Sequence, residues 1–220
     1  MDTILLSHKI NECTPTYKNR DKVRIINNSS IKSGDSSNTS KWIFSNNHIG
    51  THIDVPNHFF DEGRTLTEIE PNEWVYNNVA VIDIECKKSR LIEVEEIDER
   101  CIDPKAELIL IRTGYEEFRN QARYWKNYPS LSPELCKYLR NKYKSLRAIG
   151  VDIISITSTK FRSSGIKAHE ILLKEVNNRF ITIIEDMKLK DLKFNPSKVI
   201  VAPLLMDNTN GSPATIFALK

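Results

Sequence analysis

Short runs of almost uninterrupted apolar residues restrict the fold of this chain more than any other feature of its sequence. The runs lie at residues 79–85, 107–113, 147–151, 180–185 and 198–202. A strand-length apolar run without polar alternation is typical of a strand that is covered on both faces. Residues 3–10 predict a further short strand. We therefore expect a sheet that lies largely in the interior of the molecule.

Two amphipathic segments are expected to form helices that flank this sheet. The first has Ser132 as its N-cap and Pro133 at its first helical position. Its buried stripe is formed by Leu135, Leu139, Tyr143 and Leu146. The second carries His169, with Leu172, Leu173 and Val176 at positions i+3, i+4 and i+7, and is expected to end near Asn177.

Strands mixed with helices predict an α/β or α+β fold with a largely buried mixed sheet. Apolar segments recur along all 220 residues, so we expect a single domain spanning residues 1–220. One stretch departs from this pattern, because residues 27–40 are rich in Asn and Ser. Those residue types predict a loop, with ordered structure resuming near Trp42.

Charge and cysteine content exclude several classes of function. Lys and Arg together number 32 and Asp and Glu number 29, and the small surplus is spread out, so nucleic acid is not expected as a partner. No apolar run reaches the roughly 18 residues of a membrane span, so we expect a soluble, cytoplasmic protein without membrane contact. The four cysteines show no paired spacing and are expected to be free thiols.

The histidines are concentrated in one short segment. The chain has five, and three of them, His48, His52 and His58, fall within residues 48–58 together with Asp54. In an extended chain these four side chains share one face, while the aliphatic residues between them face the core. A straight strand would hold the α-carbons of His48 and His52 about 13 Å apart, too far for one ion. A turn or bulge at Gly50 is therefore expected, because glycine adopts positive φ without steric cost.

Imidazole and carboxylate side chains are the ligands of zinc and manganese hydrolase sites, so this segment is a candidate metal site. The alternative is a histidine-rich surface turn held by hydrogen bonds. Glu185 closes the apolar run at 180–185, and a carboxylate at the end of a buried strand needs a cation or hydrogen-bond donors nearby.

Residues 48–58 resemble the His-x-Gly-Thr-His-x-Asp-x-Pro-x-His signature of the cyclase family, whose members include kynurenine formamidases and isatin hydrolases. Further segments resemble that family in the same order, at residues 6–8, 111–114, 129–132, 149–152, 169–173, 184–185 and 211–213. The resemblance thus covers nearly the whole chain, and it implies the swivelling β/β/α-like fold of that family.

The resemblance also implies roles for individual residues. His48, His52 and Asp54 would hold one metal ion, while Asp54, His169 and Glu185 would hold a second, so that two ions, zinc or manganese, share Asp54. His58 would be the general acid/base; the alternative is that it only hydrogen-bonds a ligand. Tyr17 is the candidate for contact with an aromatic substrate. A homodimer or homotetramer is implied as well.

The activity implied is hydrolysis of an amide by metal-activated water, as in an arylformamidase, with N-formylkynurenine as the first substrate to test. Two alternatives remain open at this point. The same centre could open a cyclic amide or lactone, as in isatin hydrolysis. The chain could also be a binding protein that keeps the fold without turnover.

Overall fold

A curved mixed sheet forms the centre of the molecule in the computed structural model, which describes residues 2–220. Its strands run in the spatial order β5-β12-β13-β4-β11-β10-β8-β6, and β1 pairs with β13. The bounds are β1 (Thr3–Leu5), β4 (His52–Asp54), β5 (Val75–Tyr76), β6 (Val79–Asp83), β8 (Leu108–Arg112), β10 (Ala148–Val151), β11 (Thr182–Glu185), β12 (Lys198–Pro203) and β13 (Gly211–Leu219). The strands β6, β8, β10 and β11 are parallel to one another, and β4 lies antiparallel between β11 and β13.

The five apolar runs all form strands of this sheet, as predicted, and the sheet is covered on both faces. Strand β8 illustrates the reason: Leu108 and Leu110 belong to one buried cluster, whereas Ile109 and Ile111 belong to another on the opposite face. Because successive side chains of a strand alternate between faces, only an uninterrupted apolar run can fill two cores at once. The predicted mixed fold with a buried sheet is confirmed.

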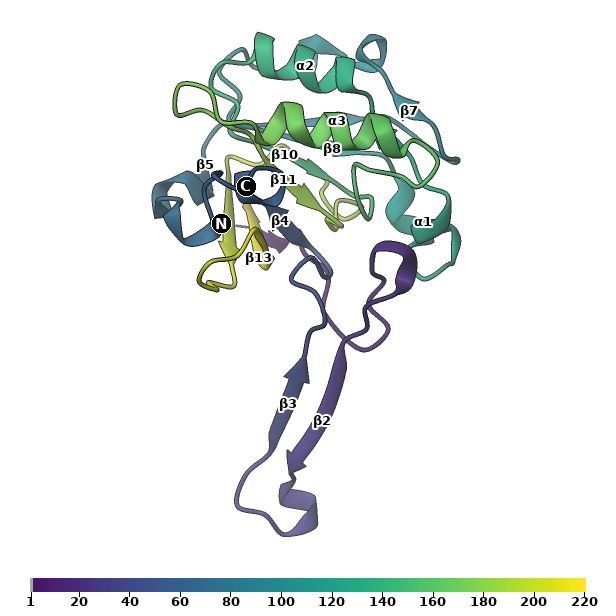
Figure 1. The fold of residues 1–220 in the computed structure, drawn as a ribbon, viewed down its shortest axis with the longest axis vertical. Helices are drawn as coiled ribbons and strands as arrows, with labels where there is room; N and C mark the ends of the chain where they lie inside the picture. Colours follow the sequence, from purple (N-terminus) through teal and green to yellow (C-terminus); the bar gives the residue numbers. More distant parts are fainter. Residues whose placement is uncertain (1) are drawn as a thin grey trace.

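Helices α2 (Pro133–Lys142) and α3 (Arg162–Leu173) lie side by side over one face of the sheet, with the short α1 (Arg123–Lys126) at one end (Figure 1). The predicted cap of α2 is confirmed, since the Ser132 hydroxyl accepts a hydrogen bond from the backbone N–H of Leu135 at 3.1 Å. The predicted end of α3 was wrong. The helix ends at Leu173, and Val176 lies outside it with 48% of its surface exposed.

A hairpin of β2 (Arg24–Ser29) and β3 (Thr39–Ile43) projects from the body of the molecule as an arm (Figure 1). The prediction of a loop over residues 27–40 was therefore wrong at both ends, although residues 30–38 do form the connection. Asn27 pairs with Ser40 and Ser29 with Thr39, across a bulge. Cross-strand hydrogen bonds between backbones hold these polar residues extended, against the turn preference of their side chains.

The sequence prediction missed β13, which links the two halves of the sheet by pairing with β1, β12 and β4. Two short strands, β7 (Leu91–Ile92) and β9 (Ser130–Leu131), pair with each other outside the main sheet. Single 3-10 turns occupy Tyr17–Asn19, Ile31–Ser33, Pro56–His58, Leu66–Glu68, Pro71–Trp74, Val94–Glu96, Glu99–Cys101 and Tyr115–Phe118. Within residues 2–220, none of the helices has the length and apolar character needed to cross a membrane.

Candidate metal centre

The turn predicted at Gly50 is present and sets the direction of the histidines on either side of it. Gly50 has φ of +62°, in the left-handed region where a side chain is strained. His52 begins β4 immediately afterwards, and its Nδ1 lies 2.8 Å from the Gly50 carbonyl oxygen. Donation from Nδ1–H to that oxygen leaves Nε2 free to face the centre. The aliphatic Ile49, Ile53 and Val55 are fully buried, as the alternation predicts.

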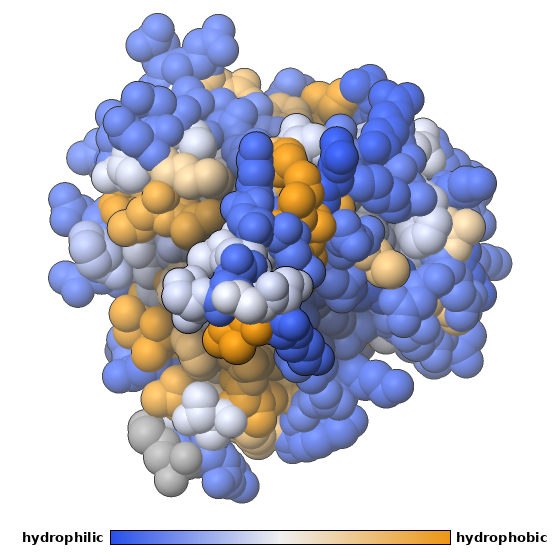
Figure 2. Space-filling view, turned by 90° about the horizontal axis from the view of Figure 1, so that it is seen from below, coloured by the Kyte–Doolittle hydropathy of each residue, from blue (hydrophilic) through white to orange (hydrophobic). Residues whose placement is uncertain are grey.

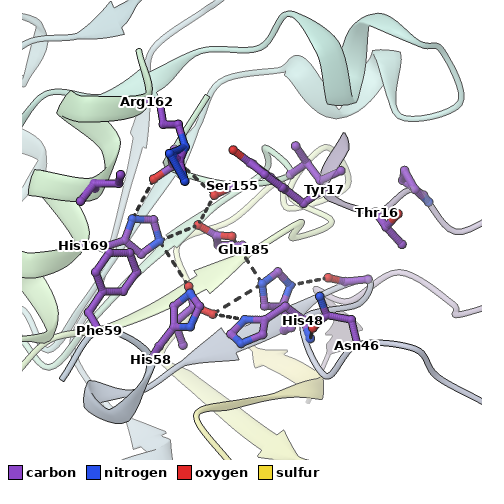
Figure 3. A pocket seen from close by; sticks show the side chains of 17 residues that line it. Thr16, Tyr17, Asn46, His48, His58, Phe59, Ser155, Arg162, His169 and Glu185 are labelled. Carbon is purple, nitrogen blue, oxygen red and sulfur yellow. Dashed lines mark hydrogen bonds and ion pairs between the residues drawn. The ribbon is translucent and has the colours of Figure 1, made fainter. Parts of the chain in front are cut away.

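Strand pairing and helix α3 bring distant residues to this segment. Glu185 at the end of β11 stands opposite His52 in the antiparallel register, so both side chains lie on the same face of the sheet. Asp54 lies two residues further along β4 and shares that face. Helix α3 covers it and adds His169, which stacks against the ring of Phe59 at a centroid distance of 4.7 Å. Figure 3 shows His169 and Glu185 with their polar ends turned toward each other, near His48 and His58.

The spacing of the converging atoms fits a metal ion. His52 Nε2 lies 3.6 Å from Asp54 Oδ1 and 3.4 Å from Glu185 Oε2. His169 Nε2 lies 3.5 Å from Asp54 Oδ2 and 3.5 Å from Glu185 Oε1. These separations are long for hydrogen bonds, but ligands about 2.1 Å from a tetrahedral ion lie about 3.4 Å from one another. Ligand atoms of His52, Asp54 and Glu185 lie within 4.8 Å of one another, and His169 faces the other oxygen of each carboxylate. The buried imidazoles and carboxylates are donor types that suit divalent cations.

Surrounding hydrogen bonds orient these side chains. His169 Nδ1 lies 2.9 Å from both the Gly165 carbonyl oxygen and the Thr157 hydroxyl, which favours a proton on Nδ1 and directs Nε2 inward. Glu185 Oε1 accepts hydrogen bonds from the Ile156 backbone N–H at 2.7 Å and the Ser155 hydroxyl at 3.1 Å. The sequence analysis did not single out these residues, although their place after the strand at 148–151 is a usual location for functional groups.

A second hydrogen-bonded group fixes the backbone behind Glu185. Asp186 adopts φ of +52°, and its carboxylate accepts hydrogen bonds from Arg119 at 2.6 to 3.2 Å and from the Tyr124 hydroxyl at 2.6 Å. The Thr51 hydroxyl donates to the Asp186 carbonyl oxygen at 2.5 Å, which ties this turn to the histidine segment. The candidate ligands on β4 and β11 are therefore held in a fixed relative position.

His48 and His58 lie on the other side of Asp54. His48 Nδ1 is 2.7 Å from Asp54 Oδ1, and its Nε2 is 2.9 Å from Asn210 Oδ1. The His58 ring lies 4.2 Å from the His48 ring and 6.0 Å from the His169 ring, between centroids. Ligand atoms of His48, Asp54 and His58 lie within 4.8 Å of one another, as do those of His52, Asp54 and Glu185. Both groups contain Asp54. The resemblance implies that His52 shares an ion with His48, whereas in the structure His52 groups with Glu185.

The pKa values of the histidines in the centre shift in opposite directions, upward for His52 and His169 and downward for His58. Burial acts to lower the pKa of His52 and of His169, but hydrogen bonds and attraction to Asp54 and Glu185 outweigh it and raise these pKa values to about 9 and about 10. Burial opposes ionisation of Asp54 and Glu185 as well, yet contacts with the histidines lower the pKa of both carboxyls. For His58 burial dominates and lowers its pKa to about 4, so its ring is neutral at pH 7.

Metal uptake is expected to release protons. With pKa values of about 9 and about 10, His52 and His169 are protonated at pH 7.5 in the metal-free protein, whereas a ligating imidazole is neutral. Binding of zinc should therefore expel one proton from each, and the apparent affinity should rise with pH until about pH 9 to 10. Calorimetric titration of zinc in buffers with different ionisation enthalpies measures this release. A binding heat independent of the buffer at pH 7.5 would contradict it.

The centre forms the floor of a cavity of about 290 Å³. All five predicted metal ligands line this cavity, namely His48, His52, Asp54, His169 and Glu185. His58 and Tyr17 also line the cavity, so the structure brings together every residue that the sequence analysis singled out. Asn46, Phe59 and Arg162 line it too and were not predicted.

A buried group of imidazoles and carboxylates at the floor of a cavity, on a mixed sheet of this topology, defines an enzyme with a metal centre. The chain belongs to the cyclase family: the family model described as "Putative cyclase" matches residues 4–158. It is 29% identical over 166 residues to a kynurenine formamidase from Geobacillus thermodenitrificans, covering 76% of this chain and 73% of that protein.

Solved structures share the fold over almost the full length of the chain. Isatin hydrolase A from Ralstonia solanacearum superposes with a TM-score of 0.83 at 18% identity, covering 100% of this chain and 92% of that one. Isatin hydrolase A from Labrenzia aggregata gives a TM-score of 0.81 at 20% identity, covering 99% and 93%. At these identities the likeness concerns the fold alone.

Proposed function

We propose that the protein is a metal-dependent hydrolase that cleaves an amide, in the manner of an arylformamidase, with N-formylkynurenine as the first candidate substrate. The observation that carries this proposal is the buried set of His52, Asp54, His169 and Glu185, with 3.4 to 3.6 Å between facing atoms and the neutral His58 beside it. The similarity to kynurenine formamidases supports the choice of substrate.

The chemistry divides between the ion and the side chains around it. A divalent ion bound at this centre would polarise the amide carbonyl and activate a water molecule. His58, with a pKa lowered to about 4 by burial, is neutral at pH 7 and can accept the proton that the water loses. It then donates this proton to the departing nitrogen, so that the amine leaves neutral and His58 returns to its starting state. Tyr17, in the wall of the cavity, would contact the substrate.

Two ions of zinc or manganese, sharing Asp54, are part of this proposal. Asp54 belongs to both groups of ligand atoms and has two carboxylate oxygens, which face His48 and His169 respectively. Imidazole ligands suit zinc, and the two carboxylates also suit the harder manganese ion.

Ring-opening of a cyclic amide or lactone is the second candidate, supported by the shared fold with isatin hydrolases. A test of both uses purified protein loaded with zinc or with manganese, assayed against N-formylkynurenine and isatin. Release of formate from N-formylkynurenine supports the first candidate, and consumption of isatin alone supports the second. If zinc- and manganese-loaded protein turned over neither these compounds nor a wider panel of formamides and lactones, the binding-protein alternative would gain support.

A homo-oligomer is also proposed, with the arm as part of its interface. Strands β2 and β3 pair only with each other among the described residues, and an isolated hairpin is marginally stable in water. A groove of about 750 Å³ at the base of the arm is lined by Leu5, Trp42, Phe44 and Leu204, each of them an exposed apolar residue. Figure 2 looks along the arm and shows apolar surface gathered on one side of it. Because this patch spans arm and body, a second copy related by two-fold symmetry could cover both patches at once.

Disruption of this patch is expected to shift the protein towards a monomer. Sedimentation or light scattering should give a mass of at least two chains for the wild type and a lower mass for Leu204→Glu. Val176→Glu is the matched control, because Val176 is also an exposed apolar residue but lies outside the patch. A wild-type mass equal to one 25.4 kDa chain would contradict the proposal.

A cytoplasmic location is part of the proposal as well. Free cysteines at all four positions support a reducing, cytoplasmic location.

A further inference from the structure

The cavity above the centre has one positive group that the proposed chemistry does not use. Its charged lining consists of the histidines, Asp54, Glu185 and Arg162. Asp54 and Glu185 lie at the floor, where a metal ion would balance their charge. Among the described residues that line the cavity, Arg162 is therefore the only side chain with a permanent positive charge.

Among residues 2–220, Arg162 has no acidic partner that neutralises it. It occupies the first position of helix α3, and no carboxylate within residues 2–220 forms an ion pair with its guanidinium. Its charge acts on the opposite wall, because it counters part of the rise that burial causes in the pKa of Tyr17. Figure 3 shows Arg162 and Tyr17 along the upper edge of the cavity, with His48 and His58 along the lower edge. The cation thus stands away from the atoms that would react.

The walls between the centre and Arg162 are largely apolar. Phe59 is held with its ring stacked on His169 at an interplanar angle of 16°, and Ile154 and Ile166 line the same cavity. A ligand that reaches from the floor to the mouth would place an apolar or aromatic body between these walls. Its far end would then meet a guanidinium with free donors, which pairs best with a carboxylate.

We propose that Arg162 recognises a carboxylate at the far end of the substrate, so that the enzyme acts on anionic aryl or apolar amides in preference to neutral ones. This inference rests on the proposed function, because it assigns the substrate class of the same cavity. Arg162 is a specificity-determining residue and takes no part in the bond cleavage.

The test compares acids with neutral isosteres of the same shape. The ortho, meta and para formamidobenzoates are assayed beside the corresponding formamidobenzamides, using zinc-loaded wild type, Arg162→Gln, Arg162→Lys and Lys167→Gln. Lys167 is the matched control, because it is an exposed cation on the same helix that does not line the cavity. The measured quantity is the ratio of kcat/KM for the acid to kcat/KM for its amide.

For at least one isomer the wild-type ratio should be roughly tenfold or more, as one charge-assisted hydrogen-bonded pair provides. The ratio should fall towards one in Arg162→Gln, recover in part in Arg162→Lys and stay unchanged in Lys167→Gln. Equal rates for acid and amide in the wild type would overturn the inference and leave the proposed function standing. A preference that persists in Arg162→Gln would overturn it as well, since the carboxylate would then bind elsewhere, for example at the metal.

Binding without turnover separates this inference from the proposed function. The same pairs are titrated calorimetrically onto zinc-loaded His58→Ala protein, with and without Arg162→Gln. If none of the formamides is hydrolysed by the wild type, the proposed function fails for this class. A carboxylate preference in binding that depends on Arg162 would still support the inference, and the absence of such a preference would refute it.

Discussion

Asp54→Asn is expected to remove most of the bound metal and to lower the rate of hydrolysis by a factor on the order of 10³ or more, because both carbonyl polarisation and water activation depend on the ion. Asp54 is the acidic residue common to both groups of ligand atoms. Its Oδ1 lies 2.7 Å from His48 Nδ1, and its Oδ2 lies 3.5 Å from His169 Nε2. Asparagine keeps the shape but replaces one of these oxygens with an amide nitrogen, which donates hydrogen bonds and cannot ligate a cation.

The measurement is the number of metal ions per chain after zinc loading and desalting, taken together with the rate on the best amide substrate. Asp61→Asn is the control, because Asp61 is an exposed acid close in sequence that does not belong to the centre. Thermal melting of both variants checks that the fold is kept. Full metal content in Asp54→Asn would show that Asp54 is not a shared ligand.

The features that could be predicted from the sequence are those encoded locally. The strands at 107–113 and 180–185 are recognisable because burial on both faces leaves few positions for a polar side chain. The turn at Gly50 could be predicted because His48 and His52 would lie too far apart in a straight strand to reach the same ion, and glycine allows the chain to turn between them. Helix α2 could be placed at its start because Ser132 and Pro133 are chemically suited to the first turn.

The features that were missed depend on contacts between distant parts of the chain. Strand β13 begins with Gly211, Ser212 and Pro213, which on local preference favour a turn, but these residues are extended because β4 pairs with them, while β12 pairs with the rest of the strand. The arm is similar, since backbone pairing holds Asn and Ser residues in β2 and β3. In the same way, Ser155 and Asn210 contact Glu185 and His48 only after the sheet has formed, and nothing in their local sequence marks them.

The end of helix α3 shows how a regular pattern can continue past the structure that it describes. Leu172 and Leu173 are fully buried, and Val176 at the next position of the stripe continues the apolar spacing. The helix nevertheless stops at Leu173, and the chain reverses through Asn177 and Asn178, which both have positive φ. His169 remains in the centre because it lies a full turn before this end.

Replacing His58 by Ala is expected to leave the metal content nearly unchanged but to slow turnover by roughly 10² to 10⁴, the usual contribution of a positioned general acid/base. The four proposed ligands that face one another all remain in this variant, namely His52, Asp54, His169 and Glu185. His52→Ala should instead lose metal and rate together, because it removes a ligand nitrogen from the middle of the centre. Both variants replace a histidine by alanine within the same short segment. A difference in metal content or rate between them therefore reflects where each imidazole ring lies in the centre.

The structure makes this comparison decisive, because His58 lies close enough to ligate as well as to carry a proton. Its ligand atom falls within 4.8 Å of those of His48 and Asp54, yet burial keeps its pKa at about 4 and its ring neutral, as either role requires. If His58→Ala and His52→Ala lost metal equally, His58 would be a ligand and the proton would have to move through another group. If His58→Ala kept full activity with full metal content, the proton transfer proposed here would be wrong even with the metal centre correct.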